Sequence, residues 1–174
     1  INVTNVNDIS PVISSSATFS AAENQTSLGT VSASDAEGDD LTYTLSGTDA
    51  ASFSISSSGV ITFDSAPDYE TKTSYSITVN VSDGVNTTTQ TLTINVTNVN
   101  NISPLFSSSA SFSAAANPSS LGTVSASDAD GDDLTYTLSV TDAASFSISS
   151  SGVITFASAP DFDTTPSSSL PSTL

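Results

Sequence analysis

The chain contains the eight-residue segment Ile1-Asn-Val-Thr-Asn-Val-Asn-Asp8, and almost the same segment returns as Ile94-Asn-Val-Thr-Asn-Val-Asn-Asn101. The offset is 93 residues (94 − 1), and it also links Phe19 with Phe112 and Asp35 with Asp128. Sequence similarity at a fixed, long period is the signature of a repeat architecture. The 174 residues therefore contain two copies of one module, each about the size of a small domain.

Repeat 1 shows the pattern of seven short strands. Apolar and polar residues alternate at every second position, as expected of strands that bury one face. These stretches lie near residues 17–21, 27–33, 41–45, 53–55, 61–63, 75–81 and 92–96, and Gly, Asp and Ser turns separate them. No segment shows helical spacing. The pattern predicts an all-β fold of tandem Greek-key β-sandwiches.

Repeat 2 reproduces the pattern only as far as Phe156, and the Ser/Pro-rich residues 165–174 follow. We expect no strand in this tail, so the second sandwich should lack its last two strands. It would then expose inner-face residues, namely Phe112, Leu134, Tyr136, Ile148 and Phe156. The predicted organisation is an N-terminal strand and linker (1–8), repeat 1 (9–97), a linker (98–104), an incomplete repeat 2 (105–164) and the tail (165–174).

The charge balance excludes several classes of partner. The net charge is -17, and Lys72 is the single cation against 18 acids. Nucleic-acid binding needs Lys or Arg to neutralise phosphates, and an anionic membrane surface attracts basic segments. Neither partner suits this chain, and no apolar run is long enough for membrane insertion. The acidity instead suggests divalent cations or a solubility role.

The absence of Cys removes disulfide bonds, which staple many small secreted animal domains. The composition therefore favours a bacterial cell-surface or extracellular protein that is stabilised by its core and by metal.

Several acidic motifs lie at the expected module ends. In repeat 1 they are Ala22-Glu23-Asn24, Asp35-Ala36-Glu37, Asp68-Tyr69-Glu70 and Asp83-Gly84, after the linker-like Asn5-Val-Asn7-Asp8-Ile-Ser-Pro11. With these motifs the sequence resembles the cadherin-like repeats of bacterial surface adhesins and, more distantly, animal cadherins. The resemblance covers essentially the whole chain, and it implies calcium bound between consecutive modules. Oxygen ligands on loops are what Ca²⁺ prefers.

The resemblance also implies which residues would bind Ca²⁺. The junction between the repeats would use Glu23, Asp68, Glu70, Asn98, Asn100, Asp128 and Asp130. A weaker site at the N-terminal end would use Asp8, Asp35, Glu37 and Asp83. Repeat 2 has Asn101 in place of Asp8 and Ala116 in place of Glu23, so fewer carboxylates would bind the ions there. The alternative is that the Asp/Gly loops are ordinary turns, because Asp bonds its own backbone and tolerates left-handed conformations.

Six Asn-x-Ser/Thr sequons are candidate glycosylation sites, and they begin at Asn2, Asn24, Asn80, Asn86, Asn95 and Asn101. Asn80 and Asn95 are flanked by inward-facing apolar residues, so both should point outward, where a glycan must be. Outward strand positions are equally where an unmodified Asn would lie.

A catalytic site is not expected, because the chain has no His or Cys and no amine side chain except Lys72. The favoured function is structural: a rod or fibre whose subunits associate head-to-tail with copies of themselves. In this hypothesis Ile1, Val3 and Val6 belong to a strand donated to the incomplete repeat of the next subunit. The alternatives are a fragment of the stalk of a large calcium-dependent adhesin and a carbohydrate-binding module. Carbohydrate sites usually need exposed aromatic side chains, whereas here the Tyr and Phe residues mostly occupy inward positions.

Overall fold

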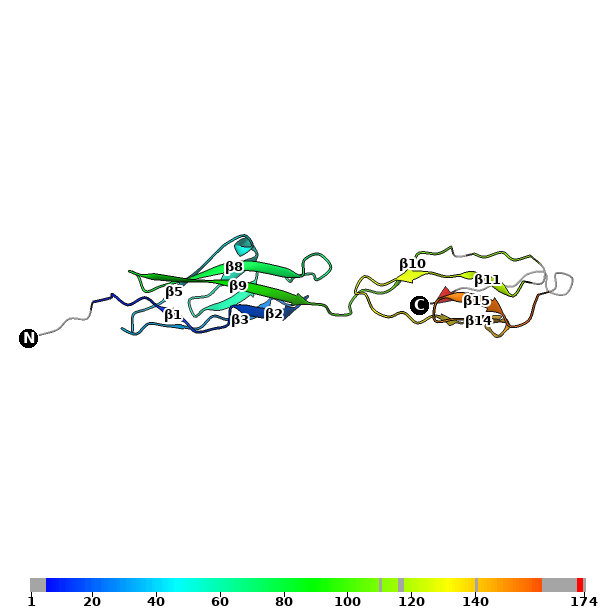
Figure 1. Ribbon diagram of the computed structural model, residues 1–174, viewed down its shortest axis with the longest axis horizontal. Coiled ribbons are helices and arrows are strands. Elements are labelled where there is room, and N and C mark those ends of the chain that lie inside the picture. The colour runs from blue at the N-terminus through cyan, green and yellow to red at the C-terminus, as the bar shows by residue number, and fades with distance from the viewer. Residues whose placement is uncertain (1–5, 110, 116–117, 140, 161–171, 174) are drawn as a thin grey trace, which may run out of the picture. The chain divides into compact units, whose positions relative to one another are not determined.

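The strands of the computed structural model follow the alternating pattern of the sequence. The structure describes residues 6–109, 111–115, 118–139, 141–160 and 172–173. The chain divides into two units, unit 1 at residues 1–99 and unit 2 at residues 100–174. Figure 1 shows the strands of each unit.

Unit 1 is a sandwich of two main sheets. The larger sheet has the order β2-β9-β8-β5, and the smaller has the order β3-β7-β6. Figure 1 shows the long β8 and β9 running side by side. A separate two-stranded pair joins β1 to β4. The strands are β1 (Val12–Ile13), β2 (Thr18–Ala22), β3 (Ser27–Thr30), β4 (Ala33–Ser34), β5 (Thr42–Ser46), β6 (Phe53–Ile55), β7 (Val60–Phe63), β8 (Ser74–Ser82) and β9 (Thr87–Thr97).

The core of unit 1 lies between these sheets. The buried faces of β8 and β9 supply half of the ten buried residues in this cluster, and the remainder come mainly from the smaller sheet. Ile77, Val79 and Val81 alternate with more exposed residues along β8, as do Leu92, Ile94 and Val96 along β9. At roughly 1.5–3 kcal/mol for each fully buried aliphatic side chain, these two strands make a large contribution to the stability of the unit.

Unit 2 repeats the smaller sheet, and within its described residues the counterpart of the larger sheet is limited to the pair β13-β16. Its sheets have the orders β11-β15-β14, β10-β12 and β13-β16. The strands are β10 (Leu105–Phe106), β11 (Ser120–Thr123), β12 (Ala126–Ser127), β13 (Thr137–Leu138), β14 (Phe146–Ile148), β15 (Val153–Phe156) and β16 (Ser172–Thr173). Its cluster of buried apolar residues, within the described part, consists of Val124, Phe146 and Ile154. The residues expected to be exposed here (Phe112, Leu134, Tyr136, Ile148 and Phe156) are half-buried.

Three details differ from the sequence-based expectation. The predicted strand at 27–33 is divided into β3 and β4, and one-turn 3₁₀ helices lie at Ala50–Ser52 and Ala143–Ser145. The expectation that the tail has no strand is wrong at Ser172–Thr173, which pairs with β13. Among the described residues, no helix has the length and apolar character to cross a membrane.

Candidate metal sites

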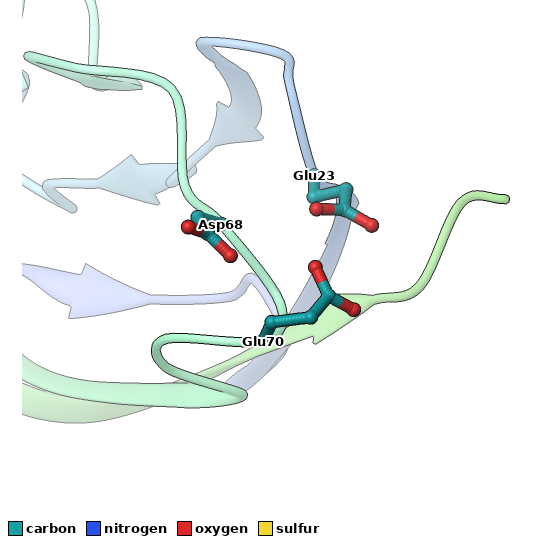
Figure 2. A group of neighbouring side chains, drawn as sticks. All are labelled: Glu23, Asp68 and Glu70. Carbon is teal, nitrogen blue, oxygen red and sulfur yellow. The ribbon is translucent and has the colours of Figure 1, made fainter. Parts of the chain in front are cut away.

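The first acidic cluster combines Glu23, Asp68 and Glu70, three of the seven residues that the resemblance placed at the junction. Glu23 follows the last residue of β2, and Asp68 and Glu70 lie on the loop between β7 and β8. One carboxylate oxygen from each lies within 4.8 Å of the other two. Figure 2 shows the three side chains grouped at this end of unit 1, with the carboxylates of Glu23 and Glu70 turned toward one another.

Glu23 is the buried member of this cluster, with 2% of its surface exposed. One carboxylate oxygen accepts a 2.8 Å hydrogen bond from the backbone N–H of Val99, and the other accepts a 3.2 Å bond from that of Tyr69. A buried carboxylate needs such donors, because burial without them is costly. The lone pairs that remain can still face a cation.

Asp68 is exposed and stabilises its own turn. The hydroxyl of Thr71 donates a 2.8 Å bond to one carboxylate oxygen, and the backbone N–H of Thr71 donates to the other. These bonds, led by that from the hydroxyl, hold the pKa of Asp68 below its ordinary value. The group is therefore ionised at neutral pH, as a metal ligand must be.

The second cluster comprises Asp35, Glu37 and Asp39, on the loop after β4. One oxygen of Asp35 accepts bonds of 2.8 and 3.1 Å from the backbone N–H groups of Glu37 and Gly38. The other oxygen, and one oxygen of Asp39, are out of contact with solvent and have no hydrogen-bond partner. Burial, and then the charges of Asp35, Glu37, Asp83 and Asp40, raise the pKa of Asp39.

A divalent cation fits this second cluster. Buried acceptors without donors are unfavourable, and neighbouring carboxylates repel one another. A cation at the cluster would satisfy the free oxygens and neutralise the repulsion. The donors are all oxygens, which suits Ca²⁺ or Mg²⁺ better than Zn²⁺.

Glu37 also binds the segment that leads into unit 1. One carboxylate oxygen accepts bonds of 2.8 and 2.9 Å from the backbone N–H groups of Asp8 and Ile9. The same arrangement recurs in unit 2, where one oxygen of Asp130 accepts bonds of 2.9 and 2.7 Å from Asn101 and Ile102. Each pair of residues differs by the 93-residue offset, so the repeat preserves this linker contact.

Asp83 lies near the second cluster and closes a hairpin. It is buried, and one oxygen accepts bonds of 2.6 and 2.8 Å from the backbone N–H groups of Asn86 and Val85. Burial raises the pKa of Asp83, but these bonds outweigh it, and the pKa is below the ordinary value. The side chain of Asn7 donates to the carbonyl of Asp83 and accepts from the side chain of Asn86.

The third cluster, in unit 2, comprises Asp128, Asp130 and Asp132. Asp128 accepts bonds of 2.9 and 3.5 Å from the backbone N–H groups of Asp130 and Asp132, as Asp35 does in unit 1. Asn100 to Pro104 and the loop from Asp132 to Thr135 line a hollow beside it. Unit 2 therefore retains the acidic loop of unit 1.

Most members of these clusters are among the expected ligands, and two are not. Asp39 and Asp132 join the second and third clusters, and a signal existed, because each lies four positions after the first Asp of its loop and at the same 93-residue offset. Asp8 contributes its backbone N–H to Glu37. Each cluster lies within one unit, so the junction set that includes Asn98 and Asn100 stays a prediction.

Of the sequons, Asn24, Asn95 and Asn101 are exposed, Asn80 and Asn86 are half-buried, and Asn2 lies outside the described residues, as do Ile1 and Val3 of the expected donor strand. The side chain of Asn86 is engaged with Asn7 and Asp83, which leaves it poorly placed for a glycan. Val6 is exposed.

Comparison with known proteins identifies the family of unit 1. The model of the bacterial Ig domain family matches residues 7–97, more than half of the chain. No curated protein matches the chain.

Solved structures with a similar fold include several cadherin fragments. Human protocadherin-24 EC1-2 has a TM-score of 0.72 at 21% identity, over 90% of this chain and 81% of that chain. Mouse cadherin-23 EC22-24 has a TM-score of 0.68 at 23% identity, over 90% of this chain and 56% of that one. Drosophila N-cadherin EC1-4 has a TM-score of 0.68 at 25% identity, over 84% and 40%. The sandwich predicted from the repeat is thus a cadherin-like fold.

Proposed function

The chain belongs to the family of bacterial Ig domains, and from this we propose that it is a structural, non-enzymatic part of an extracellular or cell-surface protein. In this proposal its cadherin-like units form a rod or fibre, and calcium binds their acidic ends and stiffens it. The main observation in support of calcium binding is the pair of carboxylate oxygens on Asp35 and Asp39, which are shielded from solvent and accept no hydrogen bond.

The repetition of the acidic loop supports a ligand-binding role. Asp35 and Asp128 arrange the same turn, and Glu37 and Asp130 accept the same pair of linker amides. A loop that served only as a turn would need one Asp, which bonds its own backbone. Each loop has three acids with oxygens within 4.8 Å of one another.

The positions of the acids support a structural role over catalysis. Glu23, Asp68 and Asp83 each accept at least two hydrogen bonds from the protein itself. A general acid or base must reach a substrate proton directly or through one water, and these carboxylates already accept hydrogen bonds from the protein. A carbohydrate-binding role is disfavoured, because no aromatic side chain among the described residues is exposed.

Calcium-dependent stability tests the proposal. An ion that binds only the folded state stabilises it by about 2.7 kcal/mol at a hundredfold excess over Kd. The melting temperature should rise by several degrees in Ca²⁺ relative to EGTA at matched ionic strength, and less in Mg²⁺. The matched control compares Asp39→Asn with Asp64→Asn, which removes the same charge outside the clusters. Equal melting temperatures in Ca²⁺ and EGTA would overturn the calcium part of the proposal.

A further inference from the structure

Strand β5 lies at an open edge of the larger sheet of unit 1. The sheet order β2-β9-β8-β5 gives β5 a single neighbour, β8. Its five residues include no charged residue and no Pro, and its pairing with β8 has no bulge. Proteins commonly protect such an edge with Lys, Pro or a bulge, because unpaired backbone groups are a template for another strand. In the smaller sheet, by contrast, the edge strand β3 is interrupted by a register shift and β6 has only three residues.

The backbone groups on this open edge belong to Tyr43 and Leu45. In an antiparallel ladder, successive residues direct their N–H and C=O groups to opposite sides of the strand. The carbonyl of Ser76 in β8 accepts a 3.3 Å hydrogen bond from the backbone N–H of Asp49, which follows β5. Ser76 therefore faces the β5 side, and so does every second residue after it along β8. Those residues pair with Thr42, Thr44 and Ser46. The backbone groups of Tyr43 and Leu45 thus point away from β8, and the structure gives them no hydrogen-bond partner among the residues it describes.

The side chains of β5 suit pairing with a second copy of the same strand. The sequence Thr42-Tyr-Thr-Leu-Ser46 alternates polar and apolar residues symmetrically about Thr44. In an antiparallel pair centred on Thr44, Tyr43 of each copy lies opposite Leu45 of the other, and the remaining pairs are hydroxyl against hydroxyl. Tyr43 and Leu45 are half-buried against the core, and the three hydroxyl residues are exposed. Aromatic–aliphatic pairs and Thr–Ser pairs both stabilise a sheet.

The charges near β5 favour the antiparallel orientation. Asp39 and Asp40 precede the strand, whereas Asp49 follows it and binds Lys72, the single cation of the chain, at 2.5 Å. A parallel pair would bring the Asp39–Asp40 ends of two copies together. An antiparallel pair places that acidic end of each copy beside the end of the other that carries Lys72, which reduces the repulsion between two chains of net charge -17. The outward residues of the adjacent β8 are also uncharged.

We propose that β5 of unit 1 pairs with β5 of a second copy of this chain, antiparallel and about a two-fold axis at Thr44. Tyr43 of each copy would exchange backbone hydrogen bonds with Leu45 of the other, which satisfies both open edges. The two four-stranded sheets would become one continuous sheet. Because the same surface is used on both copies, the contact closes as a dimer. In the rod or fibre proposed above, this contact would join two rods side by side, and it requires no calcium.

Cysteine cross-linking tests the register, because the natural chain has no Cys. The two Thr44 residues would form the non-hydrogen-bonded pair at the axis, where facing Cα atoms lie about 4.5 Å apart, a separation that a disulfide spans. Thr44→Cys should therefore give a disulfide-linked dimer under mild oxidation.

Two exposed positions on the same face are matched controls. Thr89→Cys lies on the interior strand β9, in the row that runs from Thr44 through Asn80 to Thr89, and Ser20→Cys lies on the opposite edge strand, β2. Both should give little dimer. A yield from either control equal to that from Thr44→Cys would overturn the proposal.

Charge substitution at the axis tests association without a covalent link. In sedimentation equilibrium, the mass of the natural chain should rise with concentration from that of the monomer toward twice that value. Thr44→Glu places like charges directly opposite each other, which is unfavourable in a sheet, and should abolish the rise. Thr89→Glu adds the same charge on the interior strand and should retain it.

An equimolar mixture of Thr44→Glu with Thr44→Lys should recover the dimer, because the facing charges are then opposite. The proposal is wrong if the natural chain stays monomeric, if Thr44→Glu associates as the natural chain does, or if the mixture does not recover. All runs contain EGTA, so the result is independent of the calcium proposal.

Discussion

Glu23 and Val99 lie 76 positions apart in the chain, and the backbone N–H of Val99 donates a 2.8 Å hydrogen bond to the buried carboxylate of Glu23. The second oxygen of that carboxylate accepts from Tyr69. One side chain thus joins the end of β2, the loop before β8 and the residues after β9. The buried carboxylate of Glu23 therefore fixes the path by which the chain leaves unit 1.

Replacement of Glu23 should therefore be costly even without metal. Glu23→Ala removes the acceptor of two backbone N–H groups, and each unsatisfied buried donor costs about 1–3 kcal/mol. Glu23→Gln keeps one acceptor oxygen and should lose less. Chemical denaturation in EGTA measures both losses. If Glu23→Ala is as stable as the natural chain, these hydrogen bonds contribute nothing.

Phe53→Ala should be more destabilising than Phe146→Ala. Phe53 is 5% exposed, and its ring centroid lies 4.5 Å from that of Phe63 and 5.4 Å from that of Tyr75. Among the described residues Phe146 has one ring neighbour, Phe156 at 5.0 Å. Truncation of a core Phe costs about 3–5 kcal/mol, and we expect Phe53→Ala in that range. Denaturation followed by tyrosine fluorescence would measure it, and a near-neutral Phe53→Ala would contradict the placement of the core.

Gly59→Ala should destabilise unit 1 more than Gly38→Ala. Both glycines have positive φ angles, +80° and +84°, where a side chain is strained by about 1–3 kcal/mol. At Gly59 an added Cβ would also collide with the backbone carbonyl of Val31, whereas at Gly38 nothing lies within 4 Å. The difference between the melting temperatures of the two variants therefore measures the cost of the collision at Gly59, separately from the backbone strain that both variants share. Equal shifts would mean that the backbone at Gly59 adjusts freely.

Asp39→Asn should change stability in opposite directions with and without calcium. The raised pKa of Asp39 means that the folded chain binds more protons than the unfolded one between the two pKa values. Stability from this group falls as pH rises through that window. In EGTA at pH 7 the variant should therefore be more stable than the natural chain, and the gain should disappear below pH 3.8, the ordinary pKa.

In calcium the natural chain should be the more stable of the two, because the carboxylate is then a ligand. Thermal unfolding at several pH values, with Asp64→Asn in parallel, checks both signs. A variant that is less stable than the natural chain in EGTA at neutral pH would contradict the assigned repulsion.

The sandwich could be predicted from the sequence, because the alternation of apolar and polar residues within each strand and the repeat of the module are both visible in the order of the residues. The inward positions Ile77, Val79 and Val81 are all buried. The tail was different: Ser and Pro carry no alternating pattern, so the pairing of Ser172–Thr173 with β13 depends on backbone register, which composition does not encode. The 3₁₀ turn at Ala50–Ser52 is likewise too short to produce a periodic signal.

The candidate sites were predicted less completely, for a related reason. The resemblance to cadherin-like repeats brought together Glu23, Asp68 and Glu70, which meet from two distant segments. It did not show that Glu37 binds the linker through the backbone of Asp8 and Ile9. A backbone N–H is present in every residue except proline, so a contact that uses it cannot be recognised from residue types.

The parallel pairing of β2 with β9 has a consequence for how unit 1 bears tension. β2 lies near the entry of the chain into the unit and β9 at its exit, and both run in the same direction. A pull on the two ends along the strands therefore loads all the hydrogen bonds between them in shear, so they must rupture together instead of opening one by one.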